Sequence, residues 1–309
     1  MLQRPMDVLH QFPVRKTKKQ KQAFRKAVRT YAASLGYPVR VEEGSFGARN
    51  VVIGDPENAK YLVTAHYDTC ARLLVPNSLM PCNMLFVIFQ QAFLWGGIIL
   101  VSALTGALAG LQFGEYAVVP VCWLMVFGII ALMMTGPANP SNANDNTSGV
   151  VTLLEILRTL PENQRHKVCF VLFDLEEAGL IGSSAHRKRH RAASDRQLVL
   201  NLDCVGDGDH LLMFPTKALK EDRKACTSLY RVCGYFGKKS LLVRDKGFGI
   251  YPSDQAVFPR GVGICALKKK KSGLYVGKIH TPKDTFLDET NVNILRAALI
   301  SYISCDAAQ

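Results

Sequence analysis

The hydrophobic and polar positions of the chain predict short strands alternating with helices. Continuous apolar runs bounded by polar residues are typical of buried strands, and three occur, at 61–66, 168–173 and 198–202. Shorter runs predict further strands at 39–41, 50–53, 241–243 and 262–266. Apolar residues at helical spacing predict helices at 16–35, 147–160, 182–190 and 292–303. This alternation indicates an α/β fold, with a single mixed, mostly parallel sheet flanked by helices.

A long apolar block interrupts this pattern between residues 84 and 135, where Glu115 is the only charged residue. Residues 84–111 and 116–135 are each long enough to cross about 30 Å of hydrocarbon, at about 1.5 Å per residue. A short connector joins them, so the two segments form a hairpin that returns the chain to its starting side. We therefore expect one domain built from residues 1–78 and 139–309, and an inserted hydrophobic helical hairpin, residues 79–138, with two transmembrane helices. The alternative is a soluble hairpin buried against a second subunit.

Charge supports a membrane as the partner of this hairpin. The 309 residues carry a formal net charge of +13, which a solvated basic surface would explain equally well. Arg72 precedes the hairpin and Arg158 and Arg165 follow it, whereas its connector carries only Glu115. The positive-inside rule then predicts a two-span membrane protein with its folded domain in the cytoplasm, in contact with anionic membrane lipid. Nucleic acid is not an expected partner, because no basic motif with interleaved aromatic residues occurs.

Cysteine usage and the N-terminal residues agree with that compartment. The nine cysteines are scattered, odd in number and without a CxxC motif, which indicates buried thiols in a reducing compartment. No apolar segment of a signal peptide precedes the basic run at 15–19. A second basic run, at 268–271, predicts a solvated loop or a gate for acidic substrates.

Residue types that commonly bind metal ions follow the predicted strands and recur in two polar segments elsewhere. His66, Asp203 and the 174–177 acidic stretch end the three buried runs, and Asp145 and His280 lie in polar segments elsewhere. The carboxyl ends of parallel strands meet at one sheet edge, where so many carboxylates would repel one another. Divalent cations remove that repulsion, and imidazole with carboxylate ligands suits zinc. The pair His186 and His190 lies instead in an arginine- and lysine-rich run, which predicts a solvated basic helix.

Five short stretches add a family resemblance. They read AHYD at 65–68, NDNTSG at 144–149, EEAGLIGS at 176–183, NLD at 201–203 and HTP at 280–282. In this order, and with Ser253-Asp254 between the last two, they resemble the di-zinc exopeptidases, a family of bacterial aminopeptidases, glutamate carboxypeptidases and glutaminyl cyclases. The resemblance covers about 250 residues and leaves out the hairpin.

The resemblance implies two zinc ions held by five side chains. By this resemblance His66 and Asp203 hold one ion, Glu177 and His280 hold the other, and Asp145 bridges both.

The resemblance also implies roles for residues around the ligands. Glu176 would be the general base, and Asp68 would hydrogen-bond His66 and fix its tautomer. Asp254 is a weaker structural candidate. Ile279 departs from the pattern, since many relatives carry tyrosine there, and the substitutes considered for stabilising the oxyanion are Tyr251 and Tyr275. Gln255 departs as well, where histidine is common.

The expected activity is hydrolysis of N-terminal residues from peptides with a free N-terminus, by a metallo-aminopeptidase acting at the membrane surface. Alternatives within the fold are a glutaminyl-cyclase-like acyltransferase, a carboxypeptidase and a non-catalytic binding relative. The complete ligand set together with Glu176 favours hydrolysis. The preferred side chain and the oligomeric state stay open.

Overall fold

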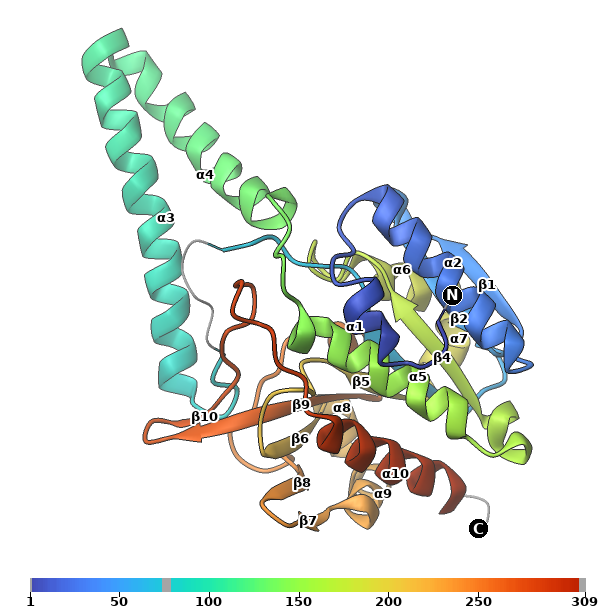
Figure 1. Ribbon diagram of the computed structural model, residues 1–309. Helices are drawn as coiled ribbons and strands as arrows, with labels where there is room; N and C mark the ends of the chain where they lie inside the picture. Colours follow the sequence, from blue (N-terminus) through green and yellow to red (C-terminus); the bar gives the residue numbers. More distant parts are fainter. Residues whose placement is uncertain (1, 74–78, 306–309) are drawn as a thin grey trace.

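The computed structural model describes residues 2–73 and 79–305 (Figure 1). Its strands are β1 (Val39–Glu43), β2 (Arg49–Ile53), β3 (Tyr61–His66), β4 (Val168–Phe173), β5 (Leu198–Leu202), β6 (His210–Pro215), β7 (Gly234–Phe236), β8 (Lys239–Val243), β9 (Gly261–Lys270) and β10 (Gly273–Tyr275). Its helices are α1 (Asp7–Gln11), α2 (Lys18–Ser34), α3 (Met84–Phe113), α4 (Val118–Thr135), α5 (Gly149–Thr159), α6 (Ile181–Arg189), α7 (Arg191–Ser194), α8 (Lys217–Glu221), α9 (Arg223–Ser228) and α10 (Glu289–Cys305).

The strands form one mixed sheet in the order β1-β2-β4-β3-β5-β9-β6-β8-β7, with β10 paired to β9. Its central strands β4, β3, β5 and β9 run parallel to one another. Antiparallel pairs flank them, β1 with β2 and β2 with β4 on one side, and β9 with β6 on the other. The parallel centre carries the carboxyl ends of β3, β4 and β5 to the same edge.

Helices cover both faces of the sheet, as the alternating pattern predicts. The larger core packs α2, α5 and α10 against one face, where Val63, Phe170 and Leu200 point from neighbouring strands. The opposite face buries alternate residues of the same strands, including Leu62, Val171 and Val199, beneath the segment at 254–257. Burial on both faces explains why these strands are continuously apolar in sequence. In Figure 1, α5 and α10 lie side by side in front of the sheet.

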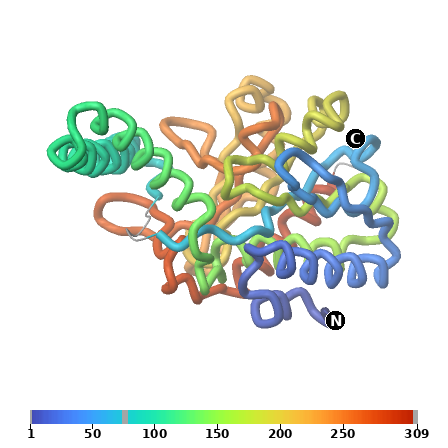
Figure 2. The backbone as a smooth tube through the Cα atoms, turned by 90° about the horizontal axis from the view of Figure 1, so that it is seen from above, coloured from blue at the N-terminus to red at the C-terminus, as the bar shows by residue number. Residues whose placement is uncertain are grey.

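The apolar block folds into the helical hairpin α3–α4, which projects away from the sheet domain (Figures 1 and 2). Both helices meet the length and hydropathy of membrane spans, and almost none of their most apolar windows is buried, 6% in α3 and none in α4. Near the outer end, a side chain at Gly106 would collide with Cys122, and one at Gly110 would collide with Val118, so these glycines permit close helix contact. The exposed apolar surface therefore belongs to a distinct element and not to the core of the sheet domain.

Both ends of the hairpin are attached to the sheet domain. Ala71 and Ala138 form an antiparallel bridge, and the Arg72 N–H donates to the Pro137 carbonyl at 2.8 Å. The Lys16 ammonium donates to the Met134 carbonyl near the end of α4 at 2.8 Å. The expected boundary at residue 78 lies within 74–78, outside the described residues.

Most predicted elements agree with the structure to within a few residues. The pattern missed the short helices α1, α7, α8 and α9 and the strands β6, β7 and β10, and it ended β9 too early. Residues 268–270 continue β9 and pair with β10, so the expectation of a solvated loop at the lysine run is wrong.

Candidate metal centre and active site

Three neighbouring strands deliver their terminal residues to one place. His66 is the last residue of β3, Asp203 directly follows β5, and the turn at 174–177 follows β4. Because β4, β3 and β5 are parallel neighbours, these ends lie side by side at the sheet edge. Asp145 comes from the irregular segment before α5, and His280 from the loop after β10. Five chain segments thus meet at a single position.

The side chains form two clusters that share Asp145. One contains His66, Asp145 and Asp203, and the other contains Asp145, Glu177 and His280 together with Cys70. One carboxylate oxygen of Asp145 lies 3.4 Å from His66 Nε2, and the other lies 3.0 Å from His280 Nε2. The structure therefore brings together all five residues that the sequence proposed as ligands, with Asp145 between the two imidazoles.

The remaining contacts complete each cluster. Asp203 Oδ1 lies 3.7 Å from His66 Nε2, and Glu177 Oε2 lies 3.6 Å from His280 Nε2. Asp203 Oδ1, which faces His66 Nε2, is buried and has no hydrogen-bond partner among the described residues. Buried polar atoms are seldom left in that condition, so a cation fits the arrangement better than an empty space does. Imidazole and carboxylate donors in these numbers suit zinc.

Asp145 is held in place through its main chain. Asp284 is buried, and its two carboxylate oxygens accept the N–H groups of Asn144 at 2.8 Å and Asp145 at 2.9 Å. The Asn146 side chain donates to the Leu202 carbonyl at 2.9 Å, and the Asp145–Asn146 peptide bond is cis. The sequence interpretation gave Asp284 no role, although it follows the HTP motif by only two residues.

The adjacent glutamates are positioned by Asp68. Its carboxylate accepts the main-chain N–H of Glu176 at 3.1 Å and that of Glu177 at 3.3 Å. Leu175 has φ 57°, so the chain turns sharply at this point and both glutamates line the same cavity. Asp68 Oδ1 lies 3.5 Å from His66 Nδ1, which is an electrostatic contact and longer than a strong hydrogen bond.

The electrostatics of the cluster show how its charges balance. Burial lowers the pKa of His66 and His280, but neighbouring carboxylates overcome that effect and raise both, His280 to about 9. Burial raises the pKa of Glu177 to about 8, and burial together with the Glu177 charge raises the pKa of Glu176 well above its usual value. Asp145 is also buried, yet the two imidazoles hold its pKa well below the usual range. Protons thus balance the buried carboxylates, and bound cations would replace those protons.

The cavity at this position has a volume of about 240 Å³. Besides the clustered residues, it is lined by Tyr251, Pro252 and Ile279, and by Gln90 and Gln91 of α3. The two glutamines belong to the hairpin and were not foreseen from the sequence. They therefore place the inserted element at the wall of the candidate active site.

Comparison with known proteins shows the family to which this chain belongs. The profile described as peptidase family M28 matches residues 131–302, which is more than half of the chain. The chain belongs to peptidase family M28. The match includes Asp145, Glu177 and His280, whereas His66 and Asp68 lie before it. A sequence comparison with curated proteins gave no match.

Solved structures of similar fold fit the M28 assignment. The chain resembles the LapA aminopeptidase of Legionella pneumophila with a TM-score of 0.57 and 15% identity, over 97% of this chain and 68% of that one. It resembles the glutaminyl cyclase of Tannerella forsythia with a TM-score of 0.57 and 16% identity, over 94% and 93% of the two chains. For the glutaminyl cyclase of Macrostomum lignano the TM-score is 0.57 and the identity 12%, over 98% and 88%. At these identities the likeness shows the fold alone.

The M28 assignment supports a zinc-dependent, peptidase-like hydrolase.

Of the two tyrosines considered for oxyanion stabilisation, Tyr251 lines the cavity, and its hydroxyl donates to the Asp203 carbonyl at 3.1 Å. Tyr275 lies on β10, with the Lys270 ammonium 4.5 Å from its ring centre, and does not contribute to the described cavity lining. Tyr251 is therefore the nearer of the two tyrosines to the cluster.

Asp254 is fully buried, and burial raises its pKa to about 7.

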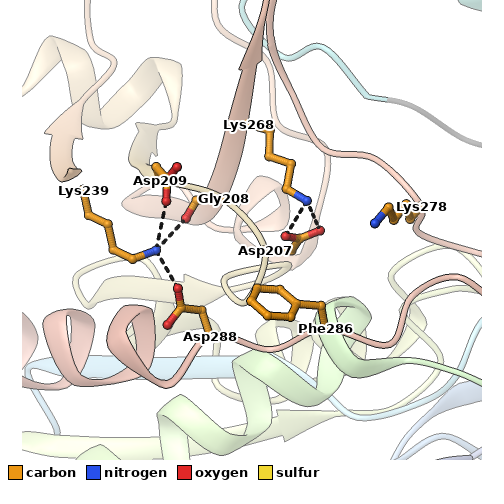
Figure 3. A pocket seen from close by; sticks show the side chains of 8 residues that line it. All are labelled: Asp207, Gly208, Asp209, Lys239, Lys268, Lys278, Phe286 and Asp288. Atoms are coloured by element: carbon orange, nitrogen blue, oxygen red, sulfur yellow. Dashed lines mark hydrogen bonds and ion pairs between the residues drawn. The ribbon is translucent and has the colours of Figure 1, made fainter.

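A separate hollow of about 390 Å³ lies beyond β9 (Figure 3). Two of its lysines point toward aspartates: Lys239 contacts Asp209 at 3.1 Å and Asp288 at 2.8 Å, and Lys268 contacts Asp207 at 2.6 Å. The third, Lys278, is drawn in Figure 3 without an ion pair to the other residues shown. The hollow therefore resembles a largely salt-bridged surface more than a binding site. Lys268 is thus engaged by Asp207 and does not stand free as a gate.

The expectation for His186 and His190 is wrong, because both side chains are buried. His186 Nδ1 lies 3.1 Å from one oxygen of Glu42, and His190 Nε2 lies 2.9 Å from the other. His190 Nδ1 also contacts Glu57. The two histidines face inward, whereas Arg187 and Arg189 stay partly exposed. The histidine pair thus forms a buried polar network that ties α6 to β1.

Proposed function

We propose that the chain is a di-zinc aminopeptidase that removes N-terminal residues from peptides at a membrane surface. The observation that carries this proposal is the position of Asp145, whose two carboxylate oxygens face two different imidazoles at 3.4 and 3.0 Å. A carboxylate so placed is suited to bridge two cations.

The proposed ligand sets follow the two clusters. His66 and Asp203 would hold one ion, Glu177 and His280 the other, and Asp145 both. When bound, a zinc pair lowers the pKa of water and polarises a carbonyl group.

Glu176 is the proposed general base. It is partly buried near His66, lines the cavity and has no place among the five ligands. Its raised pKa suits a group that accepts a proton from the attacking water and returns it to the leaving amine. Asp68 supports this role by fixing the main chain of both glutamates, and so acts as a positioning residue.

The size of the cavity supports an exopeptidase. Pockets that enclose drug-sized ligands measure roughly 300–1,000 Å³, and this one measures about 240 Å³. Such a space suits one terminal residue, while the rest of the peptide extends outward. A free α-amine would find carboxylates around it, which favours the N-terminus of a peptide over its C-terminus.

The membrane part of the proposal rests on α3 and α4. Both are long, apolar and uncovered within the described residues, and they lie far from the N-terminus. Two lysines lie at the base of the hairpin. Lys16 donates to the Met134 carbonyl, and the Lys270 ammonium lies 5.7 Å from the Phe86 ring centre. Cations at the base and Glu115 at the tip support a cytoplasmic catalytic domain by the positive-inside rule. The proposed domains are 1–78 with 139–309, and the hairpin at 79–138.

The test combines metal analysis with a substrate panel. We expect about two zinc ions per chain, cleavage of unblocked dipeptides, and no cleavage of their N-acetylated forms. Chelation should abolish turnover, and zinc should restore it. Release of ammonia from N-terminal glutamine without peptide cleavage would instead indicate a cyclase, and cleavage of blocked peptides a carboxypeptidase.

A Glu176→Gln variant tests the assignment of the base. It should retain its zinc and lose about 10²–10⁴-fold in kcat, the usual contribution of a positioned base. Glu162→Gln is the matched control, because the Glu162 side chain is 89% exposed and lies 3.9 Å from Arg165 rather than at the cluster. Equal turnover of the two variants would remove Glu176 from this role.

A further inference from the structure

Gln90 and Gln91 occupy an unusual position for residues of a membrane-type helix. Both line the cavity that also contains His66, Asp145 and Glu176. They form an adjacent polar pair within α3, between apolar residues at 84–89 and a largely apolar stretch at 92–113. The hairpin therefore contributes directly to the walls of the site.

The first turns of α3 are fixed against the catalytic domain. Leu79 forms a bridge with Val276, and the Ile250 N–H donates to the Pro81 carbonyl at 2.9 Å. Asn83 caps the helix by accepting the Phe86 N–H at 3.0 Å, and its amide donates to the Ser272 carbonyl at 3.2 Å. These contacts hold the glutamines beside the cavity as part of its wall.

Helix length places the pair relative to a bilayer. Residues 92–113 rise about 33 Å at about 1.5 Å per residue, which suffices for a hydrocarbon layer of about 30 Å. The turns before Gln90 are not needed for the span. α4 ends at Thr135, next to the Met134 carbonyl that Lys16 contacts at 2.8 Å. The part of α3 beyond Gln91 is thus long enough to span the hydrocarbon and to leave Gln90 and Gln91 at its boundary.

We propose that the cavity opens at the level of the lipid headgroups, with Gln90 and Gln91 as its membrane-side wall, and that its substrates are the free N-terminal segments of polypeptides inserted in the same bilayer. This inference rests on the proposed aminopeptidase function. Glutamine amides donate and accept hydrogen bonds without charge, so they can bind an extended peptide backbone without competing for its α-amine. Anchoring enzyme and substrate in one membrane also raises their effective concentration.

The full chain is loaded with zinc and inserted in phosphatidylcholine–phosphatidylglycerol vesicles, and its activity is measured there. One short N-terminal sequence is offered as a free peptide, or fused to a single transmembrane helix in the same or in separate vesicles. We expect kcat/KM to be at least about tenfold higher for the fusion in the same vesicles. Equal values for the free peptide and the co-inserted fusion would overturn the proposal.

The wall is tested by a Gln90→Ala, Gln91→Ala double variant. It should raise KM for the co-inserted fusion about tenfold, and by a larger factor than KM for free dipeptides, with little change in kcat for the fusion. Gln112→Ala is the matched control, because Gln112 is exposed at the far end of the same helix. Identical kinetics for the double variant and this control would refute the positioning role.

A depth measurement decides the location of the wall without relying on activity. In a Trp95→Phe, Trp123→Phe background, tryptophan introduced by Gln91→Trp should be quenched most by headgroup-labelled lipids. The native Trp95, studied with Trp123→Phe alone, lies about 6 Å further along α3 and should be quenched more by acyl-chain labels. Equal insensitivity of both positions to the lipid labels would overturn the proposed depth. Failure of every unblocked substrate with zinc-loaded wild type would reject the peptidase function, and the depth result would still stand.

Discussion

An Asp284→Asn substitution tests how the chain holds Asp145. Asp284 accepts the main-chain N–H groups of Asn144 and Asp145 at 2.8 and 2.9 Å, and both oxygens are needed. Asparagine keeps the shape and one acceptor, but its NH₂ group would face the second N–H. Losing a hydrogen bond to a charged group costs about 1.5–3 kcal/mol. If that cost falls on the metal-bound form, zinc affinity should fall about 10–100-fold, since about 1.4 kcal/mol is tenfold.

Zinc affinity is measured by competition with a chromogenic chelator, and thermal unfolding is followed with and without zinc. Asp288→Asn is the control, because Asp288 lies in the same loop, accepts the Thr290 N–H at 2.8 Å and contacts Lys239 rather than the cluster. We expect the Asp284 variant to lose more stability with zinc than without it. An unchanged affinity, or an equal loss of stability in both forms, would refute the reasoning.

Three further predictions follow from other parts of the molecule. Although burial opposes it, hydrogen bonds from His186 and His190 hold the pKa of Glu42 at about 2, so Glu42 stabilises the fold above its unfolded pKa near 4.5 and less as pH falls toward 2. Glu42→Gln should therefore lower the midpoint of urea unfolding at pH 7, and the difference from wild type should shrink below about pH 4. Arg15 is buried and donates to the carbonyls of Tyr67 at 2.5 Å and Phe12 at 2.6 Å. Lysine cannot reproduce this forked pair of hydrogen bonds, so Arg15→Lys should lower the free energy of unfolding by about 1–3 kcal/mol. Chemical denaturation measures this, and an unchanged free energy would contradict the prediction. Replacing residues 74–136 by a four-residue Gly-Ser linker should give a domain that is recovered without detergent and binds zinc, and an unfolded product would show that the hairpin base belongs to the core.

The central strands could be predicted because their environment is uniform. β3, β4 and β5 are buried on both faces, so each is a continuous apolar run whose length and end are visible in the sequence. β7 and β10 have only three residues each, and the end of β9 is a lysine run at the surface. Such segments become strands through pairing with a partner, which a local pattern does not reveal.

The candidate site was predictable for a related reason. His66 and Asp203 end strands that are parallel neighbours, so knowing the sheet type was sufficient to expect them together. The environment of His186 was not predictable, because its partner Glu42 lies 144 residues away and the flanking charges suggested solvent. The contribution of Gln90 and Gln91 likewise depends on how α3 attaches to a distant loop, which no local pattern encodes.

The bridge between Ala71 and Ala138 makes the hairpin a closed excursion from the sheet domain. The chain leaves and re-enters the domain at neighbouring residues, so the outer part of the hairpin could be lengthened or shortened without moving either point of attachment. Its base is not interchangeable in the same way, because Gln90 and Gln91 line the cavity.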